Sequence, residues 1–316
     1  QMPKNVHRDL QKVKILGERH SAIMDSEMST IQKIYWMVED CKRYGTLPFA
    51  GLARAGFVAT QFLRSLQDQG IFSAEDVSVF MNSLDTVSSQ LVRDVASWSE
   101  GKIDRDTLSS RYGHLRPGTY DILSPRYDDA FDLYFRDTPS NEDCGQQSPS
   151  FELSLSQRHA IDRLLMEHGL KFSVDELMTF IRTSIEGREF GKFLFTRHLS
   201  DILTLIKELG ERFGLETEEM SFVDIQTILR LYANLEIRDV SEILRRDIDC
   251  NREQYNLTKM IQLPSLIVEP DSVFHFFEVG SQPNFITQLR CEAETVWGEE
   301  LTEADLHGKI VFIESA

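Results

Sequence analysis

Apolar residues recur every three or four positions through most of this chain, which is the spacing that places them on one face of an α-helix. The longest such stretch runs from residue 173 to about residue 212. It begins with Ser173 and Glu176, a pair that is typical of the capping box at a helix N-terminus. A second stripe runs from Val77 to Trp98. We therefore predict a mainly α fold in which these stripes form the core.

Changes in composition divide the chain into four predicted parts. Residues 138–150, with the sequence TPSNEDCGQQSPS, are polar and rich in turn formers, and they are predicted to be a linker. A helical bundle that carries an Arg/His loop is expected over 1–137, and a second helical bundle over 151–259. Residues 260–316 hold short β-rich runs, LPSLIVEP, VFHFFEV, NFITQL and KIVFIES. The last run has no partner sequence after it, so we expect this segment to lead into a truncated domain.

Charge and cysteine content exclude several classes of function. The chain has 34 basic and 51 acidic residues, and its net charge of −17 would repel a nucleic acid backbone. No run of 18 apolar residues occurs and the N-terminus lacks an apolar signal core, so neither a membrane span nor secretion is expected. The four cysteines are far apart and form no metal-ligand pattern. We expect a cytoplasmic chain with reduced thiols and no metal site.

The strongest cluster of chemically useful side chains lies within residues 105–126. Gly113, Pro117 and Gly118 favour irregular backbone there, and loops of this kind often carry binding groups. Guanidinium groups bind phosphate or carboxylate, and an imidazole can donate a proton near neutral pH. The alternative is structural, because ion pairs among the same side chains would hold a long loop against the helices. The candidate anion- or substrate-binding residues are His114, Arg116, Asp121 and Arg126.

A second candidate group lies in the segment EGREFGKFLFTRHLS, residues 186–200. Arg188 and Lys192 share one face of a helix, whereas Arg197 lies about half a turn away, at ~100° per residue. All three can meet one anion only if the helix bends or Arg197 reaches around it. The alternative is an ion-paired, solvated helix face. Gly187 and Gly191, in the same segment, indicate a bend or a close contact with another helix.

The motifs of several catalytic classes are missing. The sequence has no GxxxxGK[ST] phosphate loop, no GxGxxG fingerprint, no HExxH and no GxSxG. Phosphoryl transfer needs positioned phosphates and metal, and no complete site for either is recognisable. We therefore assign no catalytic residue and no cofactor to this chain, and we expect the isolated chain to be inactive.

Three segments carry a resemblance to a known family. YGHLRPGTYDILSPRYDD (112–129), REFGKFLFTRHLSD (188–201) and LHGKIVFIESA (306–316) resemble segments of phosphoenolpyruvate synthase-like and pyruvate phosphate dikinase-like multidomain phosphotransferases, including rifampin phosphotransferases. The third segment resembles the entry to the phosphohistidine swivelling domain of these proteins. The chain departs from the family pattern at Leu115, where arginine is usual, and at Tyr127, where tryptophan is usual.

The resemblance implies a modular parent protein. Such proteins combine an ATP-grasp domain, which uses ATP and Mg, with a small swivelling domain whose histidine carries phosphate to an acceptor. The chain is then expected to be the helical acceptor-binding or interdomain region of an ATP-dependent phosphotransferase, with an unknown small-molecule acceptor. Its partners would be the ATP-grasp and swivelling domains. The alternative is a non-catalytic helical interaction or scaffold module whose acidic surface recruits partners.

Overall fold

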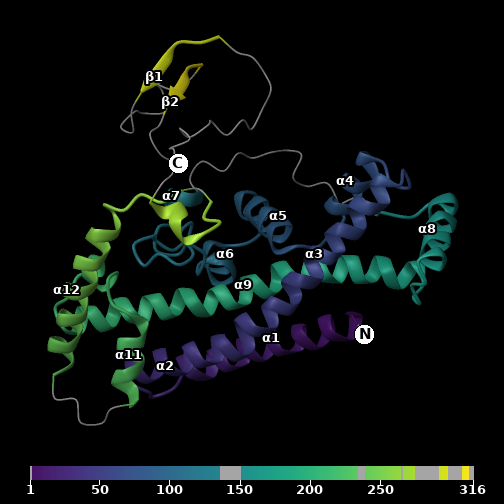
Figure 1. Ribbon diagram of the computed structural model, residues 1–316. Helices are drawn as coiled ribbons and strands as arrows, with labels where there is room; N and C mark the ends of the chain where they lie inside the picture. Colours follow the sequence, from purple (N-terminus) through teal and green to yellow (C-terminus); the bar gives the residue numbers. More distant parts are fainter. Residues whose placement is uncertain are drawn as a thin grey trace. The chain divides into compact units, whose positions relative to one another are not determined.

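A computed structural model describes residues 2–135, 151–233, 239–264, 266–274, 292–297 and 308–312. The chain divides into two compact units, residues 1–258 and residues 259–316, which are described separately. Helices dominate the described residues, so the predicted mainly α fold is confirmed (Figure 1). No helix among them is long and apolar enough to cross a membrane. The predicted linker, 138–150, lies outside the described residues.

The first unit consists of helices. Their bounds are α1 (Met2–Met24), α2 (Thr30–Asp40), the π-helix η1 (Cys41–Thr46), α3 (Leu47–Asp68), α4 (Ala74–Asn82), α5 (Val87–Ser99), α6 (Arg105–Tyr112), α7 (Phe131–Phe135), α8 (Leu155–Glu167), α9 (Val174–Arg212), α10 (Thr217–Met220), α11 (Ile225–Ala233) and α12 (Val240–Thr258).

Helix α9 is the central element of this unit, and it packs against α1, α2 and α3 (Figure 1). It begins with the predicted capping box: the Ser173 hydroxyl accepts from the Glu176 backbone amide, and the Glu176 side chain accepts from the Ser173 amide. The helix is continuous through its glycines. A Cβ at Gly191 would lie 2.8 Å from Leu52 Cδ1 of α3, so this glycine permits close helix contact.

Helices from both predicted bundles share this one unit. The contact of α9 with α1–α3 joins residues on both sides of the predicted linker. One core contains buried residues of α1, α3, α4, α8 and the first part of α9. A second contains buried residues of α1, α2, the last part of α9, α11 and α12. Because α9 supplies apolar side chains to both cores, the two sets of helices form a single body rather than separated bundles.

A third core holds the layer that carries the Arg/His loop. Its buried members come from α5, α6 and α7, and Phe193 of α9 packs against them. The predicted stripe 77–98 is broken into α4 and α5, because Thr86 starts a new helix by accepting from the Ser89 amide. Turns follow Ser124, and α7 begins at Phe131.

The second unit contains a small sheet. Strand β1 (Thr295–Trp297) pairs in parallel with β2 (Ile310–Phe312), with Val296 opposite Val311. Strand β2 lies in the predicted KIVFIES run, and its partner precedes it in the chain. The LPSLIVEP run forms no strand in its described residues, and η3 (Pro270–Val273) begins at its last residue. Most of VFHFFEV and all of NFITQL lie outside the described residues.

Candidate functional site

A groove of about 190 Å³ lies between α5, the loop after α6 and the middle of α9. It contains residues from both predicted segments, which are about 80 positions apart in the sequence. Its apolar side chains come from α5, the loop and α9, and its polar ones mostly from the loop and α9. The lining residues are Val87, Ser88, Leu91, His114, Leu115, Arg116, Thr119, Glu189, Lys192, Phe193, Thr196 and Ser200. We refer to this site as the α5–α9 groove.

The loop that forms one wall folds back on itself. The Tyr127 amide donates to the Leu115 carbonyl at 2.8 Å, and the Asp128 amide donates to the Gly113 carbonyl at 3.1 Å. A Cβ at Gly113 would lie 2.4 Å from the Ser109 carbonyl oxygen, so only glycine fits at this position. These contacts fix the backbone on both sides of the candidate arginines.

Arg116 lines the groove and attaches the loop to α9. Its Nε donates to Ser200 Oγ at 3.2 Å, and its Nη2 donates to the Ser200 carbonyl at 3.4 Å. Its Nη1 donates to the carbonyls of Asp121 and Ser124. The side chain is 9% exposed and forms no ion pair with a described carboxylate. Burial lowers the pKa of the guanidinium, which nevertheless stays charged at neutral pH.

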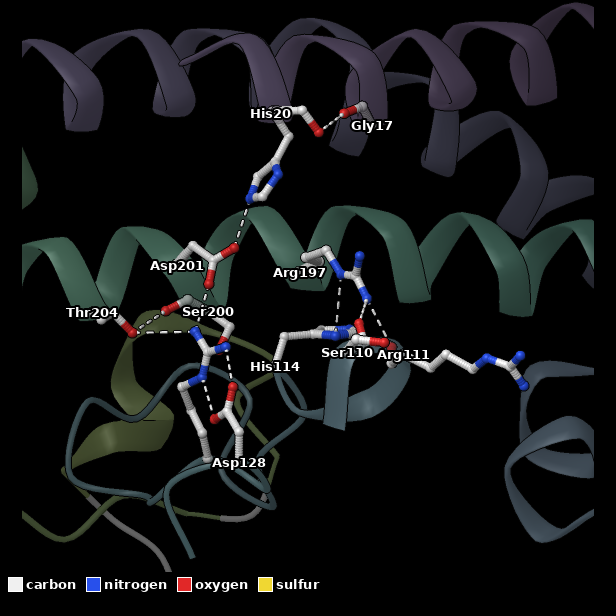
Figure 2. Close-up of polar contacts among 12 residues, drawn as sticks. Gly17, His20, Ser110, Arg111, His114, Asp128, Arg197, Ser200, Asp201 and Thr204 are labelled. Carbon is white, nitrogen blue, oxygen red and sulfur yellow. Dashed lines mark hydrogen bonds and ion pairs between the residues drawn. The ribbon is translucent and has the colours of Figure 1, made fainter. Parts of the chain in front are cut away.

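His114 is 4% exposed and neutral. Burial, and next the nearby Arg197, lower its pKa to about 3. Arg197 Nε donates to His114 Nδ1 at 3.3 Å, so the proton of the imidazole is on Nε2 (Figure 2). Nε2 is buried and has no hydrogen-bond partner among the described residues. His114 therefore offers a hydrogen-bond donor rather than an acidic imidazolium.

Arg126 belongs to a half-buried ion-pair network outside the groove lining. Its Nε and Nη2 donate to the two carboxylate oxygens of Asp128 at 2.8 and 2.7 Å, and its Nη1 donates to Asp201 Oδ1. The other Asp201 oxygen lies 2.6 Å from His20 Nε2 of α1 (Figure 2). Burial would raise the pKa of Asp201, but the bonds to His20 and Arg126 lower it. Asp201, a residue of α9, thus bonds to both the loop and α1.

The remaining candidates have separate positions. Arg197 lies beside His114 and donates to the carbonyls of Ser110 and Arg111, as Figure 2 shows. Arg188 pairs with Glu189 at 2.7 Å and lies over the Phe57 ring, and it does not line the groove. The Asp121 carboxylate accepts from the Leu123 amide, and Asp121 lines a different pocket. The groove therefore brings together His114, Arg116 and Lys192, and it leaves out Asp121, Arg126, Arg188 and Arg197.

Several residues of the site were not among the sequence candidates. Glu189, Phe193, Thr196 and Ser200 line the groove at steps of three or four along α9. Together with Lys192 they lie on one face of α9, because residues three or four positions apart share a helix face. This periodicity could have identified them from the sequence. No local signal points to Asp201 as the partner of the loop, because that contact depends on how the loop lies on α9.

The chemistry available in the groove is anion binding. Two cations, Arg116 and Lys192, line it together with one carboxylate, Glu189, which is already paired with Arg188. Among the described residues, no group of three or more His, Cys, Asp or Glu side chains could hold a metal ion. Searches with protein-family models, curated proteins and solved structures return no match to this chain.

Proposed function

We propose that this chain is the helical acceptor-binding region of a phosphoenolpyruvate synthase-like phosphotransferase, and that the α5–α9 groove binds the acceptor. In this proposal ATP and Mg bind to an ATP-grasp domain elsewhere in the parent, and a swivelling domain delivers the phosphoryl group. The chain on its own then neither hydrolyses ATP nor phosphorylates itself. Arg116, His114 and Lys192 bind and orient the acceptor.

One observation carries the proposal. Two segments that each resemble the family, 112–129 and 188–201, contribute His114, Arg116 and Lys192 to a single groove. The buried Arg116 has no carboxylate partner among the described residues, so its charge is available to an anionic group. A purely structural arginine would be expected to resemble Arg126, which is paired with two aspartates.

The test uses the parent protein. Its open reading frame should encode an ATP-grasp domain before this region and a swivelling domain with a catalytic histidine after it. In that protein, Lys192→Ala should reduce phosphate transfer to the acceptor about tenfold or more, because a charge-assisted contact to the ligand is lost. Lys207→Ala is the matched control, since Lys207 is an exposed lysine of the same helix outside the groove.

A reading frame without those domains would contradict the proposal and favour the helical interaction module. The isolated chain should then form a stable complex with a protein partner, detected by size-exclusion chromatography, and Lys192→Ala should leave that complex unchanged.

A further inference from the structure

The structure assigns a ligand class to the α5–α9 groove: a small organic carboxylate with a short apolar body. Identifying this ligand with the phosphoryl acceptor rests on the proposed function, whereas its binding can be measured on the chain alone. The charge, the free donors and the size of the groove support this assignment.

The charge of the lining suits an anion. Arg116 and Lys192 are its two cations, and Lys192 makes no ion pair with a described residue. Glu189 is its one carboxylate, and Arg188, outside the groove, balances that charge. The two cations therefore keep an uncompensated positive charge. The apolar walls then favour an organic carboxylate over inorganic phosphate.

The free donors fit the two oxygens of a carboxylate. Four bonds to Ser200, Asp121 and Ser124 use four of the five N–H groups of Arg116 and leave one on Nη2. His114 Nε2–H is buried without a hydrogen-bond partner in the described part of the chain, and this histidine lines the groove. An unsatisfied buried donor is unfavourable, so an acceptor group at this position would stabilise the site. The exposed Lys192 ammonium supplies further donors at the groove's edge.

The rest of the groove requires an apolar body of limited length. Val87, Leu91, Leu115 and Phe193 form its apolar walls. One water occupies about 30 Å³ of the liquid, so the groove's volume of about 190 Å³ holds roughly six groups of that size. A six-carbon acid fills this space and presents its methylenes to the walls. We therefore choose hexanoate as the probe.

Isothermal titration calorimetry on the 316-residue chain tests this inference with three probes: hexanoate, 1-hexanol and inorganic phosphate. Hexanoate should bind with one-site stoichiometry, and both other probes should bind at least about tenfold more weakly, because each lacks either the carboxylate or the apolar body. Lys192→Gln should weaken hexanoate binding about fivefold to tenfold through the lost charge. Lys207→Gln, an exposed lysine of α9 outside the groove, should leave it unchanged.

NMR of histidine ring nitrogens locates the binding. Hexanoate should shift the His114 Nε2 signal and leave the signal of His168, an exposed residue after α8, unchanged. Phosphate binding as tight as hexanoate, equal binding of hexanol, or no saturable binding by a folded chain would each overturn the inference. A parent without phosphotransferase domains would refute the proposed function and leave the hexanoate result standing, so the two failures are distinguishable.

Discussion

At the scale of single residues, the Arg126 network holds the loop in place, and removing one member should be costly. Arg126→Ala would leave Asp128 and the half-buried Asp201 without their cation. Breaking a fully buried pair in this way typically costs about 3–5 kcal/mol. Because this network is only half-buried, we expect the free energy of unfolding in urea to fall by about 2–3 kcal/mol. Arg105→Ala removes an exposed pair with Asp132 and should cost about 1 kcal/mol or less. Equal effects of the two variants would contradict a stabilising role of the Arg126 network.

Two buried histidines should make stability depend on pH. The pKa of His114 is lowered to about 3 by burial and then by Arg197, and that of His198 is lowered to about 3 by burial and then by His20. Below a pH of about 6.5 the unfolded chain binds protons at these positions while the folded chain does not, so stability falls as pH falls. Each histidine contributes at most about 1.4 kcal/mol per pH unit.

Urea unfolding at pH 7, 6 and 5 measures this slope before most carboxylates titrate. His198→Phe keeps a ring in a buried position and removes one titrating group, so it should make the slope shallower. His168→Gln, at an exposed position, should not. A stability that stays constant between pH 7 and pH 5 in the unmodified chain would show that these imidazoles are not buried in neutral form.

At the scale of elements, the contact between α3 and α9 depends on glycine. Gly191→Ala would place a Cβ 2.8 Å from Leu52 Cδ1, a buried position, and overpacking of this kind typically costs about 1–3 kcal/mol. Gly17→Ala in α1 meets nothing within 4 Å and should instead stabilise the chain by about 0.5–1 kcal/mol through helix propensity. Thermal unfolding of both variants gives the comparison. A Gly191→Ala chain as stable as the unmodified one would mean that the helices do not approach closely there.

Local sequence patterns predict most helices. They do not predict where one apolar stripe divides into two helices, or which strands pair. The capping box at Ser173 and the termination at Gly169 could be read from sequence, because both depend on neighbouring residues. The 77–98 stripe is broken although its apolar spacing continues, because the cap at Thr86 starts a second helix. The pairing of β2 could not be predicted either, since its partner Thr295–Trp297 is not among the β-rich runs identified in the sequence.

At the scale of the whole molecule, the candidate site could be predicted only in part. His114, Arg116 and Lys192 could be identified by residue type and then occur in one groove. The pattern did not separate Arg126 from Arg116, although the first is paired with aspartates and the second is bonded to carbonyls and to Ser200. That difference is set by tertiary contacts, because Asp201 is 75 positions from Arg126.

The arrangement of helices around α9 predicts which fragments of the chain can fold. All groove residues and all three large cores lie within residues 1–258. A fragment 1–258 should therefore keep the near-ultraviolet circular dichroism and the urea midpoint of the first unit in the full chain. A fragment 1–137 lacks α9, against which α1, α2 and α3 bury their apolar faces, so it should lose cooperative unfolding and near-ultraviolet signal. Cooperative unfolding of 1–137 would instead show that the helices before the predicted linker form an independent bundle.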